Sequence, residues 1–256
     1  YNVKLRKYML INRPCLWWVK ALPPRADWLE IPEKDRGNGY ARGKLNGSSK
    51  HPIFWNVDSN HWEQVFVAGP VTPGESDCSV LEYIPERNQA LFVNHGCVFY
   101  YDFAANAWSN TQARVKLTYD FVGCYDPKRS RVYILKESDF FAYDMKSNAW
   151  LTLAPASHPF GYSTRGQLDY DAASDVVIGM SFGGTKDGKP RGAYVYDPDK
   201  NAWSEPTSTM PNLRGTAASF YHAALNAHYV YIAGDSADDG KMLVYRFKNP
   251  ATKKGE

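Results

Sequence analysis

Short hydrophobic runs, each followed by turn-forming residues, predict β-strands along most of the chain. The clearest example lies between residues 167 and 203, where the runs QLDYD, DVVIGMSF and GAYVYD precede Trp203. Gly183 and Gly184 end the second run, and the PDKN sequence after the third is typical of a tight turn. Pro presets φ there, while Asp and Asn tolerate the left-handed region and bond to their own backbone. This pattern predicts three strands and a fourth that begins at Trp203.

The same pattern recurs three more times along the chain. Asp precedes Trp by six residues in YYDFAANAW, AYDMKSNAW and VYDPDKNAW, and WNVDSNHW is a looser copy with Asn56 at the Asp position. The tryptophans at 62, 108, 150 and 203 are 46, 42 and 53 residues apart, a period typical of solenoids, propellers or arrays. The repeated residues with an expected structural role are Trp62, Trp108, Trp150, Trp203, Asp102, Asp144 and Asp197. Each Trp should pack between its own blade and the next, and each Asp should cap a turn.

Four short strands per repeat, with almost no helical periodicity between them, predict an all-β propeller. The order of strand, Gly-Gly, loop, aromatic-Tyr-Asp and Asn-x-Trp resembles the kelch repeat. The best matches are VVIGMSFGGTKDGKPRGAYVYDPDKNAW and MPNLRGTAASFYHAALNAHYVYIAGD, and the resemblance covers residues 51 to 248. Only one repeat keeps the double glycine, since the others have Gly96, Gly234 or Lys136-Glu137 there. The resemblance implies a β-propeller of four-stranded kelch-like blades.

We interpret residues 1–256 as one propeller domain of five to six blades, with the blades at 51–248 and an irregular segment at 1–50. In this segment ADWLEI resembles NAWLTL, and YARGKL resembles the TRGQL sequence that precedes a later inner strand. The last copy stops at its third strand. An N-terminal strand that joins the last blade would close the ring and remove an open sheet edge.

The mouth of the propeller channel is the expected binding site, because inner strands line the channel. The residues at the beginnings of the predicted inner strands are Arg42, Asp77, Asp120, Arg165 and Arg214. Three arginines around one opening would attract anions. The alternative is structural: each arginine would pair with a carboxylate or carbonyl of a neighbouring blade.

Composition narrows the classes of function. The net charge of +3 comes from interspersed acidic and basic residues, which argues against a nucleic-acid partner. No apolar run reaches the ~18 residues of a membrane span.

The cysteines (Cys15, Cys78, Cys97 and Cys124) lack CxxC spacing and the six histidines form no metal motif, so we expect neither a metal nor another cofactor. The cysteines are thiols or form one or two disulfides. Their even number and the initial Tyr1 favour a secreted or periplasmic protein.

The sequence lacks the nucleophile elbow, the phosphate-binding loop and the dinucleotide fingerprint. It therefore favours a non-catalytic module that binds or scaffolds proteins, as a subunit of a larger assembly. The alternative is a carbohydrate-binding or carbohydrate-modifying enzyme that uses Asp77, Asp120, Arg165 and Arg214 at the channel mouth. An exposed aromatic patch would favour a protein partner, and carboxylates or histidines gathered at the mouth would favour the enzyme.

Overall fold

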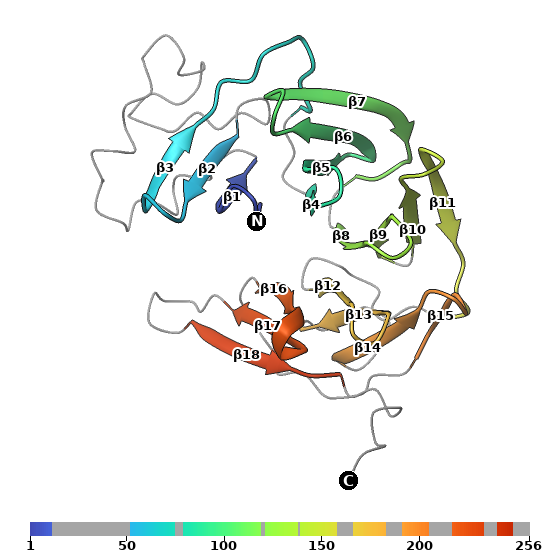
Figure 1. Cartoon of the computed structure of the whole chain (residues 1–256). Helices are drawn as coiled ribbons and strands as arrows, with labels where there is room; N and C mark the ends of the chain where they lie inside the picture. The colour runs from blue at the N-terminus through green and yellow to red at the C-terminus, as the bar shows by residue number, and fades with distance from the viewer. Residues whose placement is uncertain are drawn as a thin grey trace. The chain divides into compact units, whose positions relative to one another are not determined.

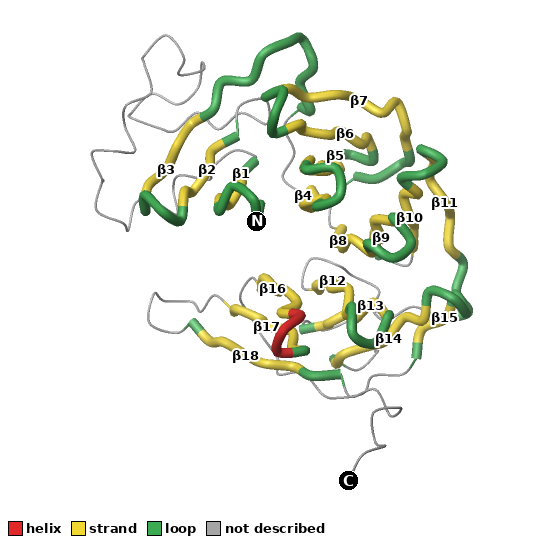
Figure 2. The backbone as a smooth tube through the Cα atoms, in the orientation of Figure 1, coloured by secondary structure: helices red, strands yellow, loops and turns green. Residues whose placement is uncertain are grey.

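The computed structural model describes residues 1–11, 52–74, 79–118, 121–137, 139–157, 166–182, 191–204, 217–232 and 240–247. These residues form antiparallel β-sheets joined by turns, with one short 3-10 helix at Ala223–Leu225 (Figures 1 and 2). The chain divides into two compact units, Tyr1–Lys116 and Leu117–Glu256. We name the sheets A to E in chain order.

The N-terminal unit contains sheets A and B. Sheet A has the strand order β1-β2-β3 and sheet B the order β4-β5-β6-β7. The strands are β1 (Lys7–Leu10), β2 (Ile53–Asn56), β3 (His61–Gln64), β4 (Ser79–Ile84), β5 (Gln89–Asn94), β6 (Cys97–Asp102) and β7 (Ala107–Arg114). Strand β1 therefore joins the first sheet. The other expectations for the N-terminal segment fall on residues 12–51, outside the described residues.

The C-terminal unit contains sheets C, D and E, with strands β8 to β11, β12 to β15 and β16 to β18 in sequential order. The strands of sheet C are β8 (Phe121–Asp126), β9 (Arg131–Lys136), β10 (Asp139–Asp144) and β11 (Ala149–Leu153). Those of sheet D are β12 (Gly166–Asp171), β13 (Val176–Ser181), β14 (Gly192–Asp197) and β15 (Ala202–Trp203). Those of sheet E are β16 (Ala217–His222), β17 (Ala227–Ile232) and β18 (Lys241–Tyr245). Strand β12 lies beside both β8 and β16, so the first strands of the three sheets are neighbours.

This succession of antiparallel sheets, stacked face to face within each unit, is the blade arrangement of a β-propeller. The expected all-β class and propeller arrangement are therefore confirmed. The described residues contain five sheets, three of four strands and two of three. The number of five to six blades, and their closure into a single domain, stay predictions.

The repeated tryptophans occupy the same place in the register of successive sheets. Trp108, Trp150 and Trp203 stand opposite Tyr101, Tyr143 and Tyr196, and Trp62 stands opposite Trp55. Directly opposite residues share a face of an antiparallel sheet. We call the face with the Tyr–Trp pair the Trp face, and the other one the reverse face.

The hairpin turns explain why the repeat keeps Tyr, Asp and Asn. In sheet C, Asp144 accepts the backbone N–H groups of Lys146 and Ser147, both at 3.0 Å, and the Tyr143 hydroxyl donates to Asn148 at 2.6 Å. Asn148 has φ of 53°, in the left-handed region that Asn tolerates. Asp102 and Asp197 accept the equivalent backbone bonds in sheets B and D. The same Tyr bond to the residue five positions later recurs at Tyr83, Tyr101, Tyr170, Tyr196 and Tyr221.

Trp203 fills the junction between sheets C and D. Its ring lies 5.1 Å from that of Tyr196 in its own sheet and 5.3 Å from that of Phe140 in sheet C. Gly179 leaves space for the ring, because a Cβ there would lie 3.0 Å from Trp203. Trp203 thus packs against the preceding sheet, whereas the repeat pattern predicted packing against the next one.

Trp108 packs in the same direction as Trp203. It is buried in a cluster with Phe54 of the preceding sheet A. Trp150 is half-buried, with the Tyr143 ring of its own sheet at 5.5 Å. The side chain of Trp62 lies outside the described part of the structure.

We expect Trp203→Ala to lower the free energy of unfolding by about 3–5 kcal/mol, because a large buried ring at a sheet junction is removed. Trp203→Phe, which keeps an aromatic ring, should cost less. Chemical denaturation followed by circular dichroism measures both. A loss below about 1 kcal/mol for Trp203→Ala would contradict the assigned packing.

Candidate functional site

The five residues expected at the channel mouth cannot be placed. Arg42, Asp77, Asp120, Arg165 and Arg214 all lie outside the described residues. In the sequence, Asp120 directly precedes β8 and Arg165 directly precedes β12. Their roles stay predictions, and the candidate site is built from the described residues instead.

The reverse face of sheet E is an exposed apolar surface. Its residues alternate along all three strands, and the register aligns them in two rows. The apolar face, as we call it, consists of Ala218, Phe220, Tyr229, Tyr231, Met242 and Val244. The exposed fractions of Phe220, Tyr231, Met242 and Val244 are 52%, 48%, 55% and 50%. The Phe220 and Tyr229 rings stack with centroids 5.4 Å apart.

The other face of sheet E packs on sheet D. Val230 and Leu243 belong to a cluster with Ile178, Met180 and Val195 of sheet D. Tyr221, His228 and Tyr245 form a row on this same face. Tyr221 bonds to Asn226 as Tyr170 bonds to Asp175, which identifies this face as equivalent to the Trp face of sheet D.

In sheet D the reverse face is buried by the following sheet. Its reverse-face residues Ile178, Met180 and Ala193 are fully buried, because sheet E covers them. The equivalent face of sheet E has equally large apolar side chains, with about half of their surface exposed. Contiguous exposed apolar residues rich in Tyr, Phe and Met mark interaction surfaces in soluble proteins.

A buried ionic cluster fastens sheet E to sheet D. The His228 side chain of β17 is fully buried, with Nδ1 3.2 Å from Asp169 Oδ2 and Nε2 3.4 Å from Asp171 Oδ2. Both carboxylates belong to β12. The rings of Tyr221 and Tyr245 lie on either side in the row, with centroids 4.9 and 5.9 Å from that of His228.

The cluster favours a charged imidazole. Burial alone lowers the pKa of His228, but the hydrogen bonds and charges of Asp169 and Asp171 outweigh it, and the net pKa lies above its ordinary value of 6.5. Burial raises the pKa of Asp171, yet the His228 bond and the Ser174 N–H shift it below its ordinary value. Because no part of the His228 side chain is exposed, the cluster is a structural link between sheets.

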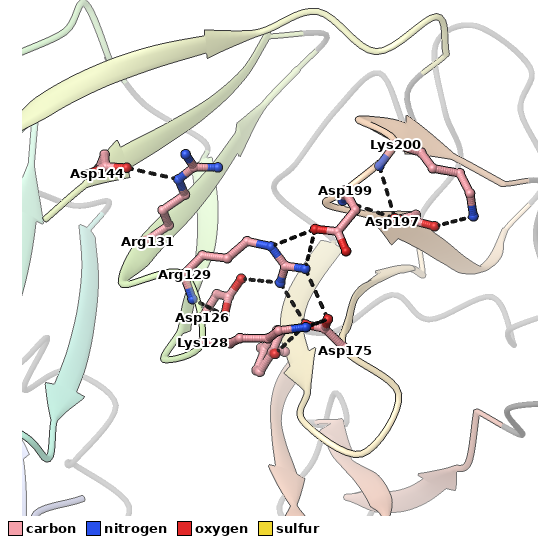
Figure 3. A network of polar contacts seen from close by, with 10 residues as sticks. Asp126, Lys128, Arg129, Arg131, Asp144, Asp175, Asp197, Asp199 and Lys200 are labelled. Carbon is pink, nitrogen blue, oxygen red and sulfur yellow. Dashed lines mark hydrogen bonds and ion pairs between the residues drawn. The ribbon is translucent and has the colours of Figure 1, made fainter. Parts of the chain in front are cut away.

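A second ionic network joins sheets C and D at their turns (Figure 3). Arg129, in the β8–β9 turn, donates to Asp175 of the β12–β13 turn at 2.7 and 3.0 Å. It also binds Asp199 of the β14–β15 turn at 2.7 Å, and Asp126 at the end of β8 in its own sheet at 3.0 Å. Lys128 forms a further ion pair with Asp175.

The Arg129 network shifts the pKa values of its members. The hydrogen bond to Arg129 is the main reason that the pKa of Asp175 lies well below its usual range. The bonds to Asp175, Asp199 and Asp126 together raise the pKa of Arg129 despite its burial. The Asp126 side chain is fully buried and the Arg129 side chain is 13% exposed, so the guanidinium is largely enclosed between sheets C and D.

The described residues give no sign of a metal site or a membrane-spanning helix. No group of three or more His, Cys, Asp or Glu side chains among them could hold a metal ion. Within the same residues no helix is long and apolar enough to cross a membrane. Cys97 and Cys124 are thiols, while Cys15 and Cys78 fall in segments that the structure does not describe.

Neither the apolar face nor the His228 cluster was predicted from the sequence. A signal for the apolar face exists in SFYHAALNAHYVYI, where aromatic residues occupy consecutive positions and therefore both faces of a strand. Nothing local indicates the cluster, because His228 and Asp169 are 59 residues apart.

The Arg129 network gives a matched pair of variants. We expect Arg129→Met to lower the free energy of unfolding by about 3 kcal/mol or more, since it leaves the buried Asp126 carboxylate without its cation. Lys128→Met removes an exposed ion pair in the same turn and should cost about 1 kcal/mol or less. If urea denaturation gives the two variants equal losses of unfolding free energy, the Arg129 network does not hold sheets C and D together.

The His228 cluster predicts a pH dependence. Because the folded pKa of His228 is raised, its contribution to stability is complete below pH 6.5 and is lost as pH rises through the folded pKa. The free energy of unfolding, measured by urea denaturation, should therefore fall in the wild type as pH rises above 6.5 and through the folded pKa of His228. It should fall much less in His228→Gln. The exposed His222 is the control, and His222→Gln should keep the wild-type slope. An unchanged slope in His228→Gln would overturn the assignment.

No family model matches the chain. No curated protein matches it either. The resemblance to kelch repeats therefore depends on the residues of the chain itself, namely the Tyr-Asp turn, Asn-x-Trp and the double glycine of one repeat.

Proposed function

We propose that this chain is a kelch-like β-propeller module without catalytic activity, which binds protein as a subunit of a larger assembly. The observation that carries the proposal is the apolar face of sheet E. It presents Phe220, Tyr231, Met242 and Val244, each about half exposed, on a regular three-stranded sheet. Aromatic residues and Met are the residue types enriched in protein interfaces.

The polar clusters support the same proposal. A catalytic acid or base must touch its substrate, but the His228 side chain and the Asp171 carboxylate are fully buried between two sheets. Arg129 is bound to three carboxylates that hold the turns of sheets C and D together. These groups stabilise the scaffold that presents the apolar face. The carbohydrate alternative depends on Asp77, Asp120, Arg165 and Arg214, outside the described residues.

The test is the mass of the tagged chain purified from its source under native conditions. The wild type should elute in a particle well above the 29.0 kDa of one chain, with every polypeptide in a fixed stoichiometry. Phe220→Glu combined with Met242→Glu should release the chain from the particle, because two charges then replace apolar contacts. Multi-angle light scattering and quantitative mass spectrometry give the masses and the stoichiometry.

The matched control is Leu225→Glu. Leu225 is 50% exposed, as the substituted residues are, but it lies in the 3-10 turn and not on the apolar face. This variant should stay in the particle. All variants must show a wild-type near-ultraviolet circular dichroism spectrum. A wild-type monomer, or a face variant that keeps its partners, would overturn the proposal.

A further inference from the structure

The apolar face of sheet E ends in a row that carries hydrogen-bond donors. His222 ends β16 and stands opposite Ala227 of β17, and its ring lies 6.1 Å from the Tyr229 ring of the apolar face. Arg246 directly follows β18, where strand alternation places it on the same face as Val244. The His222 and Arg246 side chains are exposed. We call His222, Ala227 and Arg246 the donor row.

Sheets C and D carry carboxylates at the positions of the donor row. The equivalent residues are Asp126, Arg131 and Asp144 in sheet C, and Asp171, Val176 and Asp197 in sheet D. Sheet E therefore has a donor at both positions where these two sheets have a carboxylate. Its described residues, 217–232 and 240–247, contain no Asp or Glu, so no carboxylate within this part of the sheet neutralises the row.

His222 replaces the carboxylate as a cap and gains a donor that points away from the turn. Asp171 accepts the backbone N–H of Ser174 at 2.9 Å, and His222 Nδ1 accepts that of Leu225 at 3.3 Å in the same way. A ring nitrogen that accepts a hydrogen bond carries no proton, so the proton lies on Nε2, which is a donor.

Arg246 is held beside His222 by the same turn. Its Nε donates to the carbonyl oxygen of Leu225 at 3.5 Å. Within the part of the chain that the structure describes, its two terminal nitrogens have no partner. A guanidinium presented in this way can bind a carboxylate through two parallel hydrogen bonds.

The D/E junction shows what covers a reverse face that carries polar groups. The reverse face of sheet D presents Ile178 beside Asp169 and Asp171. Sheet E covers it with Val230, which packs on the apolar cluster, and with His228, which binds both carboxylates. Apolar groups thus meet apolar groups, and carboxylates meet a donor. On sheet E the polar groups are of the opposite kind, so a matching cover combines apolar side chains with carboxylates.

We propose that the partner of the apolar face is a protein surface on which carboxylates flank apolar side chains, and that Arg246 and His222 bind one of these carboxylates. The proposal rests on the proposed function and deepens it, since it gives the chemistry of the partner at the same face. Met242 and Val244 favour protein over a glycan, because sugar hydroxyls buried against them would lack hydrogen-bond partners. Sheet E of a second copy does not fit, since its described residues lack a carboxylate.

Charge reversal in the native particle tests the proposal. Arg246→Glu sets a carboxylate against the carboxylate of the partner, so association of the tagged chain with the particle should weaken about tenfold or more. Lys241→Glu is the matched control, because it makes the same charge change at an exposed position of β18 that alternates with Met242 and so lies on the opposite face. This variant should stay in the particle. Sedimentation velocity over a dilution series measures both affinities.

A cross-link identifies the carboxylate itself. Arg246→Lys keeps the cation and supplies an amine, which a carbodiimide joins to a touching carboxylate as an amide, while the reagent takes up the released water and becomes a urea. Mass spectrometry should find this amide between position 246 and one Asp or Glu of another polypeptide, and the wild type should lack it. Replacing that acidic residue by Arg should restore binding of Arg246→Glu.

Four results would overturn the inference. They are an Arg246→Glu chain that stays in the particle, an equal loss for Lys241→Glu, a cross-link from position 246 only to the same chain, and release of the wild type by glycosidases, which would assign the acid to a glycan. All variants must keep the wild-type near-ultraviolet circular dichroism. If Arg246→Glu loses it, Arg246→Gln replaces it and still removes the charge.

Failure here is distinct from failure of the proposed function. If Phe220→Glu/Met242→Glu releases the chain and Arg246→Glu does not, the apolar face is an interface whose partner lacks the carboxylate. If neither variant releases the chain, the apolar face is not the interface.

Discussion

The structure depends on the burial of apolar sheet faces against neighbouring sheets. A strand presents alternate residues to opposite faces, so a sheet with apolar residues at consecutive positions needs a neighbour on each side. Trp203 shows how one junction is filled, since its ring reaches Phe140 of the preceding sheet over the space left by Gly179. At the A/B, C/D and D/E junctions the later sheet covers the earlier one, so the packing direction is the same within each unit.

Polar links add specificity to this apolar stacking. Apolar faces alone would tolerate some sliding of one sheet over the next, whereas Arg129 and His228 each require carboxylates at fixed positions of the adjoining sheet. Ionic groups of this kind add little net stability when compared with well-packed apolar residues, but they penalise misalignment strongly. We regard the two clusters as alignment devices at the C/D and D/E junctions.

The repeat allowed much of the fold to be predicted from the sequence. The Tyr-Asp turn and the Asn-x-Trp ending predicted the hairpins and the common register, because both depend on local backbone chemistry. The direction of Trp packing was not predictable, since a repeat looks the same whichever neighbour covers it. The His228 cluster was missed because its partners come from a strand of another repeat. The exposure of Phe220 depends on whether another sheet covers sheet E, which no local pattern encodes.

The turn with its Tyr bond keeps a constant length at one end of the strands, while the loops at the other end vary in length. The β10–β11 and β14–β15 turns each keep four residues, because the Tyr hydroxyl must reach a side chain five positions later. At the opposite end of the strands only Glu137 and Ser138 separate β9 from β10, whereas residues 182–191 separate β13 from β14. Insertions and deletions can accumulate at that end without disturbing a single turn bond. New loop sequences, whether acquired in evolution or grafted by design, would therefore be accommodated there while the register of the sheets is kept.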